Sequence, residues 1–355
     1  MIPIEVLKQV TVIYTHGHCP DGLASAMILK DAFRMLGMNP RIEFLVHGTP
    51  EHQAATDTFE QALFCDVAPR AGRGSWLHRE RWPIVLDHHV GAKDIVESFG
   101  SLGVYADAEK EPGVSGAVLA FREVWLSTFA EMIGVNEMAA DSPTHDRVRD
   151  FALCVGARDT WQTGDARFQR GQWISKMLMS KPAGWWLAES PRHVPYLTEP
   201  EVEMGRALFE AHEEAVRLAV EQCVGYALTC PAQPGLLVGR NIRLFVFQEQ
   251  ACGFRLTSDV AEALRQKPPP FEPPNFQAVV AGFSYVVDKP GDQPRLLYSL
   301  RGLGGFDVQK FATANGGGGH KAAAGFSVDP QRNDVKNPYE AIRYRLEEFL
   351  RGIDK

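Results

Sequence analysis

Residues 10–29 read VTVIYTHGHCPDGLASAMIL, and this stretch predicts the class of fold. The β-branched apolar run at 10–14 is typical of a buried strand. A polar turn follows it, and apolar residues then recur at helical spacing over 23–36. The later segments of the same two kinds are strands at 41–46, 62–65 and 84–86 and helices at 114–129 and 148–155. Strands that alternate with helices indicate an α/β fold with a parallel sheet.

The second half of the chain has a different character. Residues 161–200 show weak periodicity, whereas 201–222 have the amphipathic pattern of a connecting helix. From Gly225 onward, strand pairs and glycine-rich turns prevail, and the PPPFEPP run at 268–274 predicts an exposed loop. We therefore expect an N-terminal α/β domain at 1–165, a helical connector at 166–224 and a smaller α/β domain at 225–355.

The composition excludes several classes of protein. The 355 residues are 45% hydrophobic and 23% charged, which is typical of a soluble globular protein and not of a disordered or collagen-like one. No apolar stretch reaches the ~20 residues of a membrane span. The six cysteines have no close spacing, which favours a reduced, cytoplasmic protein over a disulfide framework.

The charge is distributed unevenly. Residues 1–224 carry 21 Lys and Arg against 31 Asp and Glu, whereas residues 225–355 carry 16 against 13. A broadly basic surface that coats nucleic acid is therefore not expected. An acidic half that binds metal and a mildly basic half that binds an anion fit this distribution, and so does an accident of solvated surface charge.

Polar clusters follow several of the predicted strands. His16, His18, Cys19 and Asp21 lie on the turn after the first strand, at the kind of edge where open α/β sheets bind ligands. Asp66 directly follows the ALFC run at 62–65. Each residue also has a structural reading, because an Asp commonly caps a helix or begins a turn. Their shared position at strand ends favours a site.

The LDHH segment at 86–89 is the least ordinary of these clusters. Asp87, His88 and His89 end another predicted strand, and imidazole with carboxylate suits Mn²⁺, Zn²⁺ or Fe²⁺. Surface histidines in a turn are the alternative. Asp159 adds a carboxylate at the end of a predicted helix. Because parallel strands end at one edge, these groups would converge as a two-metal site for phosphoester hydrolysis.

A glycine-rich segment lies near the C-terminus. Residues 315–321 read NGGGGHK, and glycines expose backbone N–H groups to an anion without a Cβ in the way. Arg301 lies upstream and suits a pair of phosphate or carboxylate oxygens. The segment predicts a cradle for a nucleotide or phosphate, with a flexible hinge as the alternative.

The order of these motifs resembles the DHH phosphoesterase family and its DHH-associated C-terminal domain. The matching segments are DGLASA (21–26), CDVAP (65–69), LDHH (86–89), SGAVLAF (115–121), ARDTW (157–161) and GGGGHKAAAGF (316–326). The resemblance spans most of the chain. It implies a Rossmann-like parallel-sheet lobe that holds Mn²⁺ and a smaller α/β lobe that binds substrate, as in nano-RNases and RecJ-like oligonucleotide phosphodiesterases.

The resemblance also implies residue roles. It makes Asp21, Asp66, His88 and Asp159 metal ligands, and places His89 on the scissile phosphate with Asp87 as a ligand or an orienting group. The first motif departs from the family: Cys19 stands where an aspartate is usual, and His16 and His18 straddle the usual histidine, so both are candidate ligands. Cys19 either binds a softer metal as thiolate or is merely packed. The substrate contacts implied in the C-terminal lobe are Arg301, Gly317, Gly318, Gly319 and His320.

The activity expected from the resemblance is metal-dependent hydrolysis of phosphoesters in short oligonucleotides or nucleotides. Two Mn²⁺ ions are the expected cofactor, with Zn²⁺, Co²⁺ or Mg²⁺ as other choices. The expected partner is a short single-stranded oligonucleotide or nucleotide, and the chain could form a homodimer. A polyphosphatase or pyrophosphatase, or a catalytically lapsed nucleotide- or RNA-binding protein, are the alternatives.

Overall fold

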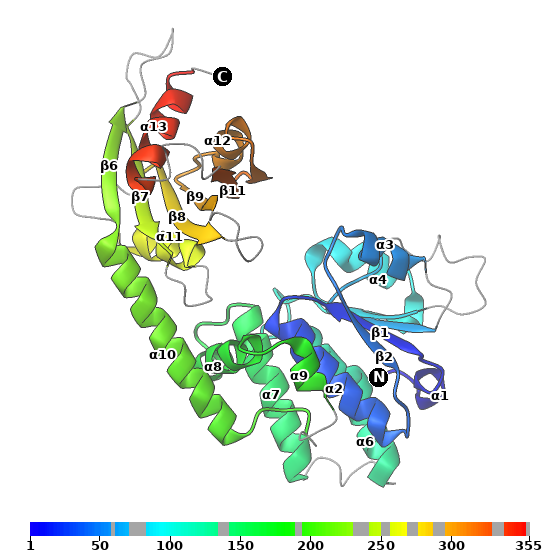
Figure 1. The fold of residues 1–355 in the computed structure, drawn as a ribbon. Coiled ribbons are helices and arrows are strands. Elements are labelled where there is room, and N and C mark those ends of the chain that lie inside the picture. Colours follow the sequence, from blue (N-terminus) through cyan, green and yellow to red (C-terminus); the bar gives the residue numbers. More distant parts are fainter. Residues whose placement is uncertain are drawn as a thin grey trace. The chain divides into compact units, whose positions relative to one another are not determined.

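The structure is a computed structural model, and it divides into two compact units, Met1–Phe209 and Glu210–Lys355 (Figure 1). The boundary lies inside helix α10 (Glu199–Gln222), so the expected connector at 166–224 contributes to both units. The three-part division of function along the chain stays a prediction. The proline-rich run at 268–274 lies outside the described residues. These are 1–57, 61–70, 83–133, 142–188, 194–229, 241–249, 256–267, 276–286, 295–328 and 337–352.

The first unit contains a five-stranded sheet in the order β2-β1-β3-β4-β5, and every neighbouring pair is parallel. This confirms the α/β class. The strands are β1 (Val12–His16), β2 (Arg41–Leu45), β3 (Ala62–Cys65), β4 (Ile84–Asp87) and β5 (Gly103–Tyr105). Strands β2, β3 and β4 lie where the sequence pattern predicts them, β1 lies two residues later than predicted and includes His16, and β5 is additional.

Helices cover both faces of this sheet. They are α1 (Ile4–Leu7), α2 (Pro20–Met35), α3 (Pro50–Thr56), α4 (Lys93–Glu97), α5 (Gly116–Leu119), α6 (Leu126–Ile133), α7 (Pro143–Asp159), α8 (Phe168–Met179) and α9 (Ala183–Leu187). The single-turn 3₁₀ segments are η2 (Val90–Ala92) and η3 (Gly100–Leu102), and the π-helical turn η4 (Ala120–Trp125) joins α5 to α6. Helices α8 and α9 lie in the stretch whose weak periodicity gave no helix.

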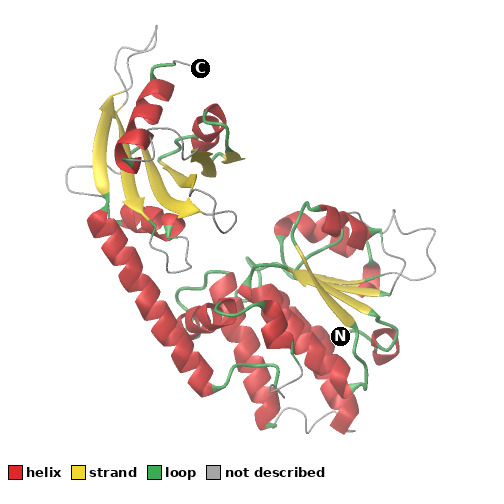
Figure 2. Cartoon of the chain, in the orientation of Figure 1, coloured by secondary structure: helices red, strands yellow, loops and turns green. Residues whose placement is uncertain are grey.

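Alternation along the strands divides the hydrophobic core into two layers. Ile13 and Leu63 pack with α2 and the helices near α7 in one cluster, whereas Tyr14 and Phe64 pack with α3 and α4 in another. Successive strand residues point to opposite faces, so both faces of the sheet are buried. Figure 2 shows the helices on the two sides of these strands.

The strand order marks one edge of this sheet as a candidate edge for binding a ligand. The chain passes from β1 outward to β2 and returns to β3 on the other side of β1, so neighbouring connections leave in opposite directions. In open α/β sheets, ligands bind outside the carboxyl ends of the strands at such a reversal. The polar residues that follow β1, β3 and β4 lie at this edge.

The second unit contains a mixed six-stranded sheet in the order β10-β11-β9-β8-β7-β6, in which only β7 and β8 pair in parallel. The strands are β6 (Val224–Thr229), β7 (Asn241–Gln248), β8 (Ala278–Val286), β9 (Arg295–Leu303), β10 (Gly318–His320) and β11 (Ala323–Val328). Helices α12 (Val308–Ala314) and α13 (Pro338–Leu350) pack on one face, and α11 (Thr257–Gln266) packs on the other. The second unit is thus also α/β.

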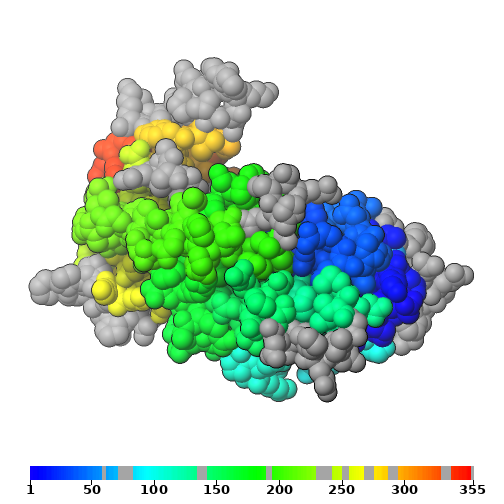
Figure 3. Space-filling view, turned by 90° about the horizontal axis from the view of Figure 1, so that it is seen from below, coloured from blue at the N-terminus to red at the C-terminus, as the bar shows by residue number. Residues whose placement is uncertain are grey.

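Segments far apart in the sequence meet in the first unit. Helix α2 contacts α8 and α9, and Figure 3 shows blue N-terminal residues beside the green residues of the later helices.

Among the described residues, no helix is both long and apolar enough to cross a membrane.

Candidate metal centre

Four acidic and imidazole side chains from separate parts of the first unit meet at one edge of its sheet. Asp66 directly follows β3, and His88 directly follows β4. Asp21 lies in the first turn of α2, and Asp159 is the last residue of α7. The structure therefore brings together the four residues that the sequence motifs single out as metal ligands.

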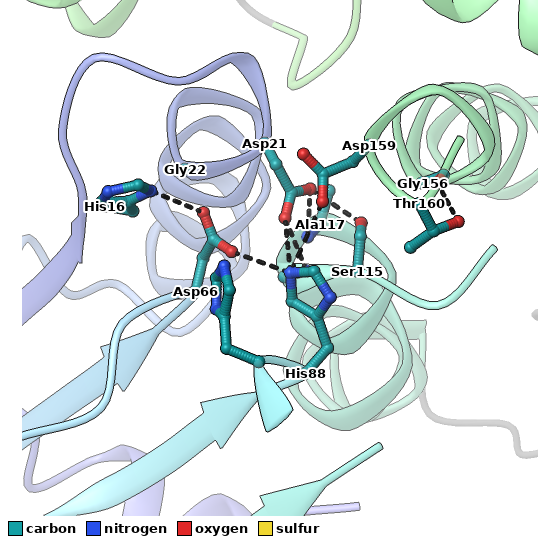
Figure 4. A network of polar contacts seen from close by, with 12 residues as sticks. His16, Asp21, Gly22, Asp66, His88, Ser115, Ala117, Gly156, Asp159 and Thr160 are labelled. Carbon is teal, nitrogen blue, oxygen red and sulfur yellow. Dashed lines mark hydrogen bonds and ion pairs between the residues drawn. The ribbon is translucent and has the colours of Figure 1, made fainter. Parts of the chain in front are cut away.

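The His88 imidazole lies at the middle of the group. Its Nε2 is 3.2 Å from Asp66 Oδ1, 3.5 Å from Asp159 Oδ2 and 3.8 Å from Asp21 Oδ2. Figure 4 shows the three carboxylates pointing toward this ring from different elements. His88, Asp21 and Asp66 are buried, so water does little to screen the carboxylates from one another.

Asp21 is fixed by the segment that begins α5. The Ser115 hydroxyl and the Ala117 N–H donate to its Oδ1 at 2.7 and 3.0 Å, and the Gly116 N–H donates to its Oδ2 at 2.7 Å. A Cβ on Gly116 would lie 2.4 Å from the Asp66 Cβ, so only glycine allows this approach. Sequence reasoning did not assign Ser115 or Gly116 a role, although they begin the SGAVLAF motif.

Asp66 occupies the left-handed backbone region, with φ of 62°. That conformation is uncommon for a residue with a side chain, although Asp tolerates it better than most. Burial, and then the neighbouring Asp21, raise the pKa of the Asp66 carboxyl well above its usual range. Burial and Asp21 likewise raise the pKa of Asp159 to about 6. Carboxylates in this position are stable in the ionised form only when a cation compensates them.

Asp87 orients His89. Among the described residues, three sets of His, Cys and Asp side chains have donor atoms close enough to hold a metal ion, and Asp87 belongs to none of them. The buried Asp87 Oδ1 accepts from the His89 backbone N–H at 2.9 Å and lies 2.7 Å from His89 Nδ1. This contact with Asp87 raises the pKa of His89 despite partial burial. It also fixes the ring so that the proton sits on Nδ1 and Nε2 remains the outward atom.

The turn after β1 contributes a second set of donors. His16, Cys19 and Asp66 each offer one atom, and these atoms lie within 4.8 Å of one another. Burial, and then His89, lower the pKa of His16, whereas burial and Asp66 raise the pKa of the Cys19 thiol. His18 is exposed, has φ of 63° and is in none of the three donor groups of the described residues. The structure thus brings His16 to the centre and leaves His18 outside it.

The donors fit divalent cations. Two more groups of three residues each offer ligand atoms that lie within 4.8 Å of one another. One group is Asp66, His88 and His89, and the other is Asp21, His88 and Asp159. Imidazole and carboxylate together suit Mn²⁺, Zn²⁺ or Fe²⁺. The Asp21 and Asp66 carboxyl groups are both buried and close to each other, and a positive charge between them would offset their repulsion. Asp66 and His88 each belong to two of the three groups, and of the two only the carboxylate has two oxygens with which to contact two ions.

The predicted substrate residues of the second unit lie across three adjacent strands. Arg301 on β9 pairs with Ala323 on β11, which pairs with His320 on β10. Directly paired residues share a face, so Arg301 and His320 flank a small side chain, roughly 10 Å apart at two strand spacings. Arg301 Nε donates to Ser258 Oγ at 2.9 Å. One face of the sheet therefore carries Arg301 and His320 on either side of Ala323.

The glycines of this segment have distinct structural reasons. A Cβ on Gly317 would lie 2.1 Å from the Gly325 carbonyl oxygen. Gly319 has φ of 139°, and a Cβ on it would lie 2.6 Å from the Ala323 carbonyl oxygen. Only Gly318 of these three has open space on its Cβ side. Residues 318–320 form an exposed edge strand, so the segment is a strand and not a hinge.

No protein-family profile matches the chain, and no curated protein matches it. Solved structures do match. One, described as a DHH-domain member of the s1p family of ribosomal proteins, is 12% identical, with 97% of this chain and 88% of that chain covered and a TM-score of 0.48. Exonuclease RecJ bound to manganese is 18% identical, with 98% and 92% covered and a TM-score of 0.48.

A pGpG-specific phosphodiesterase from Vibrio cholerae is 12% identical, with 98% of this chain and all (100%) of that chain covered and a TM-score of 0.42. Of these three, the first is described as a DHH-domain protein, and all three TM-scores are below 0.5. The argument for an activity therefore rests on the residues of the site.

Proposed function

We propose that this protein is a divalent-metal-dependent phosphoesterase that hydrolyses phosphoester bonds in short oligonucleotides or nucleotides. One observation carries the proposal. His88 Nε2 lies within 3.8 Å of carboxylate oxygens from Asp21, Asp66 and Asp159, which come from three separate elements. A structural role needs no such concentration of buried negative charge, which destabilises a protein without a cation.

Asp21, Asp66, His88 and Asp159 would hold the metal, with Mn²⁺ as the expected ion. A divalent ion there would supply Lewis acidity toward a phosphoryl group and a nucleophilic water at neutral pH. The protein's own contribution is to fix the ligands. Ser115 and two backbone N–H groups leave Asp21 a single orientation, and a hydrogen bond that is buried in this way resists reorganisation.

His89 is the proposed group that contacts the substrate. Asp87 Oδ1 lies 2.7 Å from its Nδ1 and raises the pKa of the ring, and a ring protonated at both nitrogens would present its Nε2–H to the substrate. A fixed donor of this kind stabilises negative charge that develops on phosphoryl oxygens. Asp87 acts through His89, so it is a positioning residue.

The exposed β10 edge of the second unit is a proposed binding surface for an anion. Arg301 supplies a planar guanidinium, His320 a ring nitrogen, and Gly318 a backbone without a side chain in the way. Residues 225–355 carry a small excess of Lys and Arg over Asp and Glu, 16 against 13, which suits a short anion better than a long strand.

The test is a panel of substrates with Mn²⁺ and the metal-free full chain as starting material. It compares pApA, short RNA, short DNA, adenosine bisphosphate and polyphosphate. We expect turnover of the nucleotide substrates that His88→Ala abolishes. His89→Gln should lower kcat with little change in Mn²⁺ affinity, and Arg301→Ala should raise KM and leave kcat nearly unchanged.

The other outcomes distinguish the alternatives. Turnover of polyphosphate alone would identify a polyphosphatase or pyrophosphatase. Nucleotide binding without metal and without turnover would identify a lapsed binding protein. Degradation of long strands with no cleavage of dinucleotides would contradict the short-substrate proposal.

A further inference from the structure

One donor group in the centre contains sulfur. Cys19 Sγ lies 3.3 Å from Asp66 Oδ2, and His16 Nδ1 lies 3.8 Å from the same oxygen. The group formed by Asp21, His88 and Asp159 offers only nitrogen and oxygen. The two sets of donors therefore differ in softness although both are next to Asp66.

The chain holds the sulfur in place at the beginning of α2. Cys19 is the N-cap residue, and its Sγ accepts a hydrogen bond from the Gly22 N–H at 3.1 Å. Ser, Asp and Asn are better N-caps than Cys, because an oxygen accepts more strongly than sulfur. Capping alone would favour one of those residues. The Cys19 thiol also donates to Asp66 Oδ2 at 3.3 Å, so the sulfur already faces this carboxylate, and a metal ion would take the place of the shared proton.

The backbone around the turn admits little movement of Cys19 relative to His16. A Cβ on Gly22 would lie 2.1 Å from the His16 carbonyl oxygen, so α2 begins directly against the end of β1. The Thr15 hydroxyl, which is buried, donates to the Gly22 carbonyl at 2.8 Å. The nitrogen, sulfur and carboxylate donors are thus preorganised by main-chain packing.

We propose that Cys19 binds one of the metal ions as a thiolate, together with His16 and Asp66, so that the two metal positions of this centre have different preferences. The sulfur-containing position takes a borderline-soft ion such as Zn²⁺ or Co²⁺. The position of Asp21, His88 and Asp159 takes a harder ion such as Mn²⁺ or Mg²⁺. This inference rests on the proposed metal centre, but not on which phosphoester is cleaved.

Binding at the sulfur position exchanges one bond for another. The Cys19 S–H bond breaks, its proton passes to the solvent, and the sulfur electron pair forms the bond to the metal. No oxidant or reductant takes part. Three protein ligands leave an open coordination position, as sites that also meet a substrate do.

The experiment is a titration of the metal-free full chain with Co²⁺, followed by its absorption spectrum. A cobalt–thiolate bond gives an intense charge-transfer band in the near ultraviolet, which nitrogen and oxygen ligands do not give. We expect a band that saturates with one ion per chain. Cys19→Ser should abolish it, since serine keeps a cap for the Gly22 N–H but offers no thiolate. Cys223→Ser, which changes a cysteine outside the centre, should leave it intact.

A second variant keeps the proposal testable if serine perturbs the turn. Cys19→Asp restores an anionic oxygen donor, so it should lack the band, bind Zn²⁺ at least about tenfold more weakly and keep its Mn²⁺ affinity. The proposal is overturned if the wild-type chain gives no band or if Cys19→Ser retains it. A band without phosphoesterase turnover would reject the proposed function alone, and turnover without a band would reject the thiolate ligand alone.

Discussion

Replacing Asp159 with asparagine should stabilise the metal-free protein while it weakens metal binding. The Asp159 side chain is 24% exposed, and burial with Asp21 nearby raises its pKa from 3.8 to about 6. The unfolded chain therefore releases this proton at a lower pH than the folded chain does. Stability is then lost as the pH rises from about 4 to about 6, and the loss persists above that range.

The magnitude follows from the size of the shift. At 1.36 kcal/mol per unit of pKa, the ionised Asp159 destabilises the metal-free fold by about 3 kcal/mol at about pH 7.5, and by about half of that at about pH 5. The Asp159→Asn substitution would remove this cost, because the amide carries no charge. For a unit the size of Met1–Phe209, about 3 kcal/mol corresponds to a rise in Tm of roughly 6–12 °C.

The assay is thermal unfolding of the full chain in chelator and with Mn²⁺, at both pH values. In chelator at the higher pH, Asp159→Asn should unfold at a higher temperature than the wild type, and the difference should shrink at the lower pH. Mn²⁺ in 100-fold excess over its Kd would stabilise the wild type by about 2.7 kcal/mol, and should stabilise the variant less. Asp150→Asn, which alters an exposed carboxylate on the same helix, is the matched control and should shift stability by less than about 1 kcal/mol. A variant that is no more stable than the wild type in chelator would contradict a destabilising charge at Asp159.

Three further predictions concern the same unit. Trp161 has φ of 58° at the position after α7 where helices usually place glycine. Trp161→Gly should therefore raise the free energy of unfolding by about 1 kcal/mol, whereas Trp161→Ala should not. Urea unfolding measures both. Gly116→Ala would bring a Cβ to 2.4 Å from the Asp66 Cβ. Calorimetry should then show that Mn²⁺ binds at least about tenfold more weakly, while the far-ultraviolet circular dichroism spectrum stays unchanged. The apparent Mn²⁺ affinity of the wild type should fall as the pH drops below about 6, because protons compete with the metal for Asp159. An affinity that stays constant from about pH 7 to about pH 5 would contradict the role of Asp159 as a ligand.

The sequence predicted those parts of the centre that depend on strand ends. Asp66 and His88 each follow a short apolar run, and parallel strands place such residues at one edge. The choice between His16 and His18 could not be made in the same way. Two histidines separated by one residue look alike in a pattern, whereas the left-handed backbone at His18 turns it outward.

Other features depend on contacts that leave no local pattern. Gly116 serves the centre through its backbone N–H and its missing Cβ, and neither property distinguishes it from a glycine in an ordinary turn. The contact of Cys19 with Asp66 joins residues 47 positions apart, so it requires the pairing of β1 with β3. Strand β5 has three residues, too few to show alternation, and α8 was obscured by glycine and tryptophan within its apolar pattern.

The spacing of the ligands along the chain has a consequence for the lifetime of the protein. Asp21, Asp66, His88 and Asp159 are held by elements that are joined through long intervening segments, so ions bound among them would close several loops at once. Such a closure acts as a reversible cross-link, and its benefit grows with the length of chain that it encloses. The supply of metal would then govern how long each molecule resists proteolysis, quite apart from whether it meets a substrate.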